Sequence, residues 1–325
     1  MYRTARTIAV GVVLALTVAA CGDDGDEPSS TAAPATDAPA TDPTGTDVPS
    51  TDPAAPSGSD DVPSTVERIV SLSPTHTEIL YAIGADDLVV AVDDQSTYPP
   101  EAADKLTDLS GFTPNIEAIA SYEPDLVVIG DDFNDLTSQL DRVGIAVWSG
   151  TAAVTFDDIY DQIEQLGAVT GRVGEAAELV LQMQTDIEAA VASVPEVSTP
   201  LTYYHELDPT FYSVTSNTFI GEVYGLFGLR NIADSAEVTT DYPQLSAEFI
   251  ISENPDLVFL ADTKCCGESP ETVAARPGWG EIQAVITGHV IPVDDDIASR
   301  WGPRVVDYVQ LVGAAVTDVA AVSAG

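Results

Sequence analysis

An internal repeat is the feature of this chain that most restricts its fold. The segment from Glu117 to Gly130 returns as Glu248 to Ala261, with 7 of 14 positions identical at a constant offset of 131 residues. Each copy has the pattern of a short helix, a Pro-Asp turn and a continuously apolar strand, which is typical of a parallel sheet buried on both faces. Because a repeat in fixed register indicates a duplicated structural unit, we expect an α/β protein with two similar lobes.

From Val66 onward, short apolar runs alternate with helical patterns, which predicts Rossmann-like lobes with mainly parallel sheets. Strands are expected at 67–72, 88–92, 126–129 and 145–148, then at 201–204, 257–260 and 290–293. A helix is expected at 75–83, and apolar residues at helical spacing predict one longer helix at 172–194, roughly 33 Å long. This long helix would join an N-terminal lobe (65–171) rigidly to a C-terminal lobe (195–325), with a ligand cleft between the lobes.

Residues 1–21 have the features of a lipoprotein signal peptide. Arg3 and Arg6 precede an apolar run of about a dozen residues, which is too short for an ordinary membrane span. The run ends in Val18-Ala19-Ala20-Cys21, and small residues before a cysteine at this distance resemble a bacterial lipobox. We therefore predict that Cys21 is lipidated and anchors the protein to the outer face of the cytoplasmic membrane. An ordinary signal peptide with a chance cysteine is the alternative.

The next segment, 22–64, is predicted to be a disordered tether. It consists mainly of Ala, Thr, Pro, Asp and Ser and contains neither Lys nor Arg, so it cannot bury enough apolar surface to fold. A flexible chain of this length spans roughly 35–40 Å root-mean-square. The whole chain has 11 Lys and Arg against 53 Asp and Glu, a formal net charge of -42, which argues against nucleic acid and anionic lipid headgroups as partners.

Enzyme motifs are missing from the sequence. It contains no Gly-rich phosphate loop, no Gly-x-Ser-x-Gly motif and no His-Glu-x-x-His pair, so we predict no catalytic residue, no metal site and no cofactor. His76 follows the first predicted strand, where open α/β sheets present ligand sites, and His205 ends the strand that begins at Thr202. Two histidines from opposite lobes could help hold a metal or haem iron; otherwise they are polar residues of the cleft or its rim.

Aromatic residues and arginines are the other candidates for ligand contact. The aromatic side chains fall mostly in loops after predicted strands and would suit a large, flat or chelated ligand. They are Tyr98, Phe112, Phe133, Tyr212, Tyr242 and Trp301. Arg300 and Arg304 lie in one loop after the last strand and offer forked donors to carboxylate or phenolate oxygens of a ligand. The alternative is a salt bridge from each arginine to one of the many acidic residues.

Cys265 and Cys266 are adjacent in the sequence. With Cys21 lipidated, they can only pair with each other or stay free. A vicinal disulfide would join Cα atoms about 3.8 Å apart, which is below the usual disulfide range. A redox-active pair would be required by one alternative function, that of a surface lipoprotein reductase acting on a bound complex.

Several short motifs occur in an order and spacing that resemble one known family. In the first half they are Ser71–Leu80, Ala82–Gly84, Tyr98–Pro100, Gly111–Glu117 and Pro124–Leu126, and in the second half Phe219–Glu222, Asn231–Ala233, Tyr242–Ser246 and Trp279–Val285. Together these motifs resemble the ferric-siderophore and cobalamin binding proteins of ABC importers. The resemblance implies two lobes bridged by a long helix, with a ligand in the cleft and Tyr98, Phe112, Tyr242 and Trp301 on the cleft walls.

These observations predict an extracytoplasmic, monomeric solute-binding lipoprotein that delivers a small metal chelate to an ABC permease and its ATPase subunits. The expected ligand is an iron-siderophore or cobalamin. The paired arginines favour the siderophore, since cobalamin is not strongly anionic. A haem-binding carrier or sensor lipoprotein is a further alternative.

Glu117 and Glu248 are predicted to dock the loaded protein onto the permease. They occupy the same position in the two copies of the repeat, each in the first turn of its helix. In the resembled family, glutamates at these two motif positions meet arginine pockets on the two permease subunits. Thr113-Pro114 is expected to start the first helix and Ser246 to cap the second. The alternative is that each glutamate only complements its helix dipole.

Overall fold

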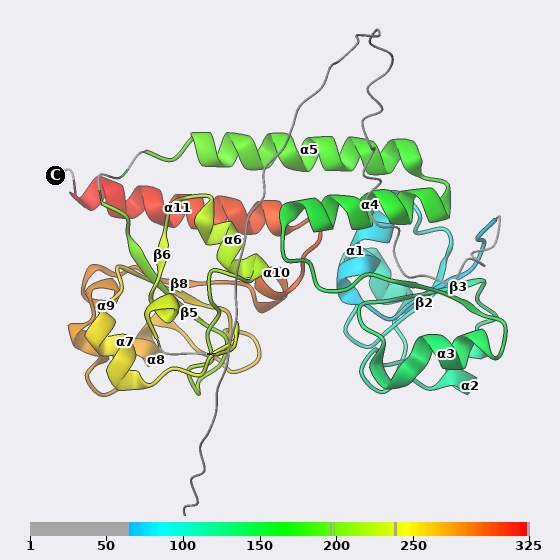
Figure 1. Ribbon diagram of the computed structural model, residues 1–325, viewed down its shortest axis with the longest axis horizontal. Coiled ribbons are helices and arrows are strands. Elements are labelled where there is room, and N and C mark those ends of the chain that lie inside the picture. Colours follow the sequence, from blue (N-terminus) through cyan, green and yellow to red (C-terminus); the bar gives the residue numbers. More distant parts are fainter. Residues whose placement is uncertain (1–64, 196, 198, 237–238, 324–325) are drawn as a thin grey trace, which may run out of the picture. The chain divides into compact units, whose positions relative to one another are not determined.

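Two parallel sheets of four strands each form the two lobes, as the repeat predicts (Figure 1). The computed structural model describes residues 65–323 apart from 196, 198, 237 and 238. The predicted signal peptide, the lipidated Cys21 and the tether therefore lie outside the described residues. Within the described part of the chain, no helix is both long enough and apolar enough to cross a membrane.

The sheet of the N-terminal lobe has the strand order β2-β1-β3-β4, and every pair in it is parallel. Its strands are β1 (Ile69–Ser71), β2 (Val89–Val92), β3 (Leu126–Ile129) and β4 (Ala146–Ser149). The C-terminal sheet has the matching order β6-β5-β7-β8, also parallel throughout. Its strands are β5 (Thr202–Glu206), β6 (Arg230–Asn231), β7 (Leu257–Leu260) and β8 (Val290–Pro292).

The repeated segment builds the same unit twice. β3 and β7 hold the same place in their sheets, and the residue directly before the Pro-Asp turn, Glu123 or Asn254, has φ of 51° in both copies. The aspartate of each Pro-Asp turn then reaches the neighbouring strand. Asp125 Oδ2 accepts a 3.0 Å hydrogen bond from the amide of Arg68, and Asp256 Oδ2 accepts one of 2.8 Å from the amide of Thr202. The repeated Asp therefore aligns β3 with β1 and β7 with β5.

Helices cover both sheets. In the N-terminal lobe they are α1 (Pro74–Ala82), α2 (Ile116–Ala120), α3 (Leu136–Asp141) and α4 (Phe156–Thr170). In the C-terminal lobe they are α6 (Phe219–Gly225), α7 (Ala247–Glu253), α8 (Pro270–Ala274), α9 (Gln283–Thr287) and α10 (Asp295–Ser299). The connecting helix is α5 (Val173–Ala192), and α11 (Val305–Ser323) ends the described chain.

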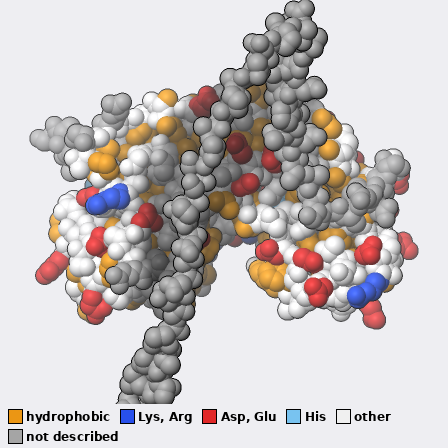
Figure 2. All heavy atoms as spheres, in the orientation of Figure 1, with side chains coloured by type: hydrophobic (Ala, Val, Ile, Leu, Met, Phe, Trp, Pro, Cys, Tyr) orange, Lys and Arg blue, Asp and Glu red, His pale blue; other side chains and the backbone are white. Residues whose placement is uncertain are grey.

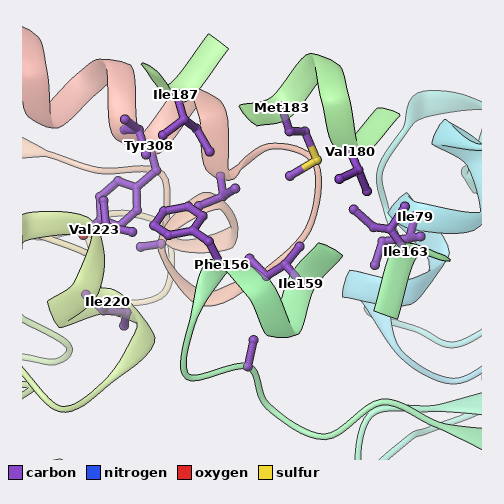
Figure 3. Packing of buried hydrophobic residues seen from close by; sticks show 14 of the residues in the cluster. Ile79, Phe156, Ile159, Ile163, Val180, Met183, Ile187, Ile220, Val223 and Tyr308 are labelled. Atoms are coloured by element: carbon purple, nitrogen blue, oxygen red, sulfur yellow. The ribbon is translucent and has the colours of Figure 1, made fainter. Parts of the chain in front are cut away.

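The connection between the lobes involves more than the one predicted helix. α5 lies beside α4 at one end and beside α11 at the other (Figure 1). Its buried residues, Ala176, Val180, Met183 and Ile187, recur every three or four positions and so form one face. That face belongs to a continuous apolar cluster that reaches from Ile79 of α1 to α6 and α11 (Figure 3). Because one core serves both lobes, their relative position is fixed by packing as well as by chain connection.

Candidate functional site

A cavity lies at the edge of the N-terminal sheet where the strand order reverses. The chain crosses from β1 to β2 on one side and places β3 on the other, so the loops that follow these strands diverge and leave a crevice. The cavity has a volume of about 390 Å³ and is lined by Leu72, Ser73, Pro74, Thr75, Asp93, Gln95, Gly111, Phe112, Gly130, Asp131, Phe133, Asp296, Ser299, Arg300 and Trp301. The last four residues come from α10 and the segment after it, so both lobes contribute to the cavity wall.

Two glycines let the loops on the N-terminal side of the cavity lie close to the residues that follow β1. A Cβ atom at Gly111 would lie 2.4 Å from the carbonyl oxygen of Leu72, and one at Gly130 would lie 3.2 Å from Ser73 Oγ. Asp93 lies beside them and is almost fully buried, and its Oδ1 has no hydrogen-bond partner. Burial raises the pKa of Asp93 to about 6. This carboxyl group therefore lies in the cavity wall with one oxygen that has no partner among the described residues.

Aromatic rings line the cavity from both lobes. Phe112 is 66% exposed, and its ring centroid lies 5.5 Å from that of Phe133. Trp301 comes from the segment before α11, and its Nε1 donates a 3.3 Å hydrogen bond to Gln162 of α4. Exposed rings of this kind offer flat apolar surface to a ligand with extended faces.

Alternating charges cross from the C-terminal lobe to the N-terminal lobe beside the cavity. Lys264 Nζ lies 2.9 Å from Asp296, whose other oxygen lies 2.8 Å from Arg300. Arg300 also donates to Glu78 of α1 at 2.9 Å, and Arg304 Nε donates to the same carboxylate at 2.7 Å. Lys264 Nζ also lies 2.6 Å from Asp294. We call these six residues, Lys264, Asp294, Asp296, Arg300, Glu78 and Arg304, the ion-pair chain. Both arginines are thus paired with acidic residues, which is the alternative that the sequence left open.

The two candidate histidines do not come together. His76 is fully buried behind Trp301 and Trp148, and its ring nitrogens lie 2.7 Å from Ser73 Oγ and 2.9 Å from Gln162 Oε1. Burial lowers the pKa of His76 to about 4, so the ring is neutral and supports the cavity wall from behind.

His205 lies inside β5 rather than at its end, fully buried, with Nδ1 2.8 Å from the hydroxyl of Tyr224. The hypothesis that the two histidines share a metal is therefore wrong for this geometry. Among the described residues, no group of three or more His, Cys, Asp or Glu is placed to hold a metal ion.

The other predicted ligand contacts are divided between several places. Phe112, Arg300 and Trp301 line the cavity. Tyr98 and Arg304 line a neighbouring groove instead, where the guanidinium lies 4.2 Å from the centre of the tyrosine ring. Tyr212 and Tyr242 are half exposed in the C-terminal lobe and are not part of the cavity lining. Their contact with a ligand stays a prediction.

Sequence reasoning missed several polar residues of the cavity. They include Ser73, Asp93, Asp131 and Asp296. Each of them follows a strand by one to four residues. The position of ligand sites at the carboxyl ends of parallel strands would have found them.

Glu117 and Glu248 are exposed and equivalent. Each is the second residue of its helix, α2 or α7. Asn115 rather than Thr113-Pro114 caps the first helix, by accepting from the amide of Ala118, because its short side chain reaches an amide that the helix leaves free. Ser246 caps the second helix as predicted, by accepting from Phe249.

Cys265 and Cys266 form a vicinal disulfide in an exposed loop after β7. Asp295 accepts hydrogen bonds from the backbone amides of Lys264 and Cys265, at 3.0 and 2.8 Å. The loop is thereby attached to the start of α10, whose other residues reach the cavity.

The corresponding edge of the C-terminal sheet is filled rather than open. Glu206, at the end of β5, is fully buried and accepts two 2.6 Å hydrogen bonds from Arg276. The guanidinium of Arg276 lies 4.6 Å from the centre of the Trp279 ring and 5.5 Å from that of Phe211. Asp262 follows β7 and is also fully buried; burial and the charge of Glu206 raise its pKa to about 7.

Two parallel α/β lobes, a long connecting helix and a cavity formed by both lobes together define a solute-binding protein. Residues 69–297 match the family described as "Periplasmic binding protein", and the chain belongs to this family.

The chain is 29% identical to the uncharacterized ABC transporter substrate-binding lipoprotein YvrC of Bacillus subtilis, over 95% of this chain and 96% of the relative. It is 31% identical to a cobalamin-binding protein of Halobacterium salinarum, over 79% of this chain and 71% of the relative. The crystal structure of the periplasmic vitamin B12 binding protein BtuF of Vibrio cholerae is similar with a TM-score of 0.65 at 28% identity, covering 78% of this chain and 98% of that structure.

Proposed function

We propose that this protein is the substrate-binding lipoprotein of an ABC importer and that its cleft binds an uncharged corrinoid of the cobalamin type. The observation that carries the proposal is a cavity with aromatic faces and hydrogen-bond acceptors, where the one arginine among the described lining residues is already paired with acidic residues. The names of the Halobacterium and Vibrio relatives support a corrinoid, and the name of the Bacillus relative supports an importer and a lipid anchor.

The charge of the cavity favours an uncharged ligand over an anionic one. Asp93, Asp131 and Asp296 line it, against Arg300 alone. Carboxylates accept hydrogen bonds from amide N–H groups, which surround a corrin ring, and repel the carboxylates of haem or of an anionic siderophore. The preference for an anionic siderophore assumed that Arg300 and Arg304 are free to bind the ligand. Because both arginines form ion pairs with acidic residues, we favour an uncharged ligand instead.

The positions of the histidines also argue against haem. An axial bond from His76 to iron would require both of its hydrogen bonds to rearrange and the ring to leave its buried place. His205 is buried in the C-terminal core. A corrinoid cobalt already has its ring and axial ligands, so it needs none from the protein.

The cavity would hold one edge of such a ligand. Its volume of about 390 Å³ is smaller than a corrinoid, so the remainder would extend between the lobes. The half-exposed rings of Tyr212 and Tyr242 on the C-terminal lobe are candidates to meet it.

The test is calorimetric titration of the purified chain with cyanocobalamin, haemin, a ferric catecholate and an uncharged ferric hydroxamate. We expect tight binding of cyanocobalamin and at least about 100-fold weaker binding of the two anionic chelates, a difference of about 2.7 kcal/mol. Tightest binding of haemin or of the catecholate would refute the proposed ligand. Tightest binding of the hydroxamate would retain the charge argument but replace the corrinoid.

Docking to the permease is proposed to use Glu117 and Glu248. Their support is their exposure at the same helical position in the two lobes, which presents two carboxylates with a fixed spacing. Charge-assisted pairs with arginines on the permease would read that spacing. Replacing both by Ala should leave ligand affinity intact and abolish uptake and stimulation of the transporter's ATPase in proteoliposomes; wild-type uptake by the double variant would contradict this role.

Anchoring through Cys21 is proposed from the lipobox-like run alone. Cys21→Ala should release the protein from membranes and move it to the aqueous phase in a detergent partition. Unchanged retention with the membrane would mean that another segment holds the protein there.

A further inference from the structure

Glu78 is the most deeply buried member of the ion-pair chain. Its side chain is 2% exposed, whereas those of Arg300 and Arg304 are 10% and 13% exposed. It sits on α1, directly behind the residues that line the cavity, and it accepts hydrogen bonds from both arginines. A single carboxylate therefore orients two guanidinium groups from the other end of the chain.

The ion-pair chain has no surplus charge in the wild-type protein. Lys264, Arg300 and Arg304 carry three positive charges, and Asp294, Asp296 and Glu78 carry three negative charges. Removing the charge of Glu78 would leave one surplus positive charge on the ion-pair chain beside the cavity, since Arg300 keeps its pair with Asp296 while Arg304, in the neighbouring groove, loses its pair with Glu78. The balance thus depends on a residue that does not itself line the cavity.

We infer that Glu78 determines the charge selectivity of the ligand site, by acting through Arg300 as a positioning residue. It holds the Arg300 guanidinium against α1 and cancels the positive charge that would otherwise attract an anionic ligand. This inference rests on the proposed function, because the ligands used to test it are a corrinoid and its charged derivative. It goes beyond that function by naming the residue that excludes ligands carrying a carboxylate.

The experiment compares two ligands that differ by one charge and hardly in shape. They are cyanocobalamin and its monocarboxylic derivative, in which one side-chain amide is hydrolysed to a carboxylate. For Glu78→Gln we expect the affinity for the monocarboxylate, relative to cyanocobalamin, to rise about 3- to 10-fold. This is the size of the Coulomb attraction between one unit charge beside the cavity and the ligand carboxylate. The rise should shrink as the salt concentration increases.

Two further variants separate charge from packing. Glu101→Gln removes an exposed carboxylate from the groove beside Arg304 and changes the net charge equally, so it should leave the ratio unchanged. The double variant Glu78→Gln/Arg304→Gln restores the balance of the chain and should return the ratio to the wild-type value. A ratio that stays at the wild-type value in Glu78→Gln, or that rises equally in Glu101→Gln, would overturn the inference.

The inference remains testable if Glu78→Gln does not fold. Arg304→Gln alone leaves the chain with a surplus negative charge and should shift the ratio toward cyanocobalamin; an unchanged ratio would overturn it. If the wild type binds no cyanocobalamin, the proposed ligand is wrong, but the same variants can be compared on haemin and its uncharged dimethyl ester. Glu78→Gln should then shift the ratio toward haemin and Arg304→Gln toward the dimethyl ester, and the absence of both shifts would overturn the role of Glu78.

Discussion

The two lobes have the same strand order, yet the edge where that order reverses is open in one and filled in the other. In the N-terminal lobe, Gly130 and Asp131 follow β3 and border the cavity. In the C-terminal lobe, the repeat places Ala261 and Asp262 after β7, and both are buried. Arg276 occupies the space there and pairs with Glu206. Duplication thus sets the backbone of both edges, and a few side chains decide which edge is open.

The difference in charge follows the same division. Acidic side chains far outnumber basic ones on the face of the molecule shown in Figure 2. Arg276 neutralises a buried carboxylate that belongs to the fold, whereas Arg300 lies at the ligand cavity.

The largest effect on stability is expected when the guanidinium of Arg276 is removed from the filled edge. Arg276→Met would leave Glu206 buried without its partner and should lower the free energy of unfolding by about 3–5 kcal/mol. Urea unfolding followed by tryptophan fluorescence would measure it. The control is Arg172→Met, whose partner Asp87 is 64% exposed, for which about 0–1 kcal/mol is expected. If both variants lost the same free energy of unfolding, the ion pair of Arg276 and Glu206 would not stabilise the fold more than an exposed pair does.

A second effect concerns Asp262, which directly follows the second copy of the repeat, as Asp131 follows the first. The stability that Asp262 contributes should depend on pH. Because the pKa of Asp262 is raised from 3.8 to about 7, the folded state keeps a proton that the unfolded state has lost. The stability from this group is full below pH 4 and is lost as the pH rises through 7. Asp262→Asn should therefore gain about 1–3 kcal/mol over wild type at pH 8 and little at pH 4.

Asp131→Asn provides the matched comparison for that measurement. Asp131 is exposed, so its replacement by Asn should change the free energy of unfolding by no more than about 0.5 kcal/mol. A flat difference between Asp262→Asn and wild type across this pH range would contradict the buried, protonated state of Asp262.

A third effect concerns the aromatic residues of the two edges. Phe112 is 66% exposed at the cavity, so Phe112→Ala should lower the affinity for cyanocobalamin about 10-fold, or about 1.4 kcal/mol, with little change in unfolding. Phe211 packs on Trp279 in the filled edge, so Phe211→Ala should lower the free energy of unfolding and leave the affinity for cyanocobalamin unchanged. Calorimetry and urea unfolding on both variants would check this, and a loss of affinity from Phe211→Ala would place the ligand closer to the C-terminal edge.

The smallest effect is expected at the vicinal disulfide. Cys265 and Cys266 are exposed, so replacing both by Ser should change the free energy of unfolding by no more than about 0.5 kcal/mol. Ligand affinity should be unchanged. A clear loss of affinity would show that the loop transmits its position to Asp296 through Lys264, and would reopen a redox role for the pair.

The repeat explains why much of the fold was predictable. β3 and β7 have the predicted bounds because continuous apolar runs between turns leave little choice of strand position. β6 was missed because two residues, Arg230 and Asn231, are too few to show a pattern. β5 extends through His205 and Glu206 because its pairing with β7 continues there. The sequence did not predict this extension, since polar residues do not indicate a buried strand.

The site was only partly predictable because its charges are paired over long distances in sequence. Arg300 and Arg304 stood out as rare cations, but nothing in the sequence could choose Glu78 as their partner from 53 acidic residues. The histidines were misread for a similar reason, since Gln162 and Tyr224 occupy their nitrogens only in the folded chain.

The bond between Arg300 and Glu78 joins residues 222 positions apart. A ribosome makes the chain from its N-terminus. For most of synthesis, the N-terminal lobe therefore has a cavity without its C-terminal wall, and Glu78 has no arginine partner. Contacts of such long sequence separation form late in folding. A chain truncated before residue 300 therefore lacks the part of the cavity wall that Arg300 and Trp301 form.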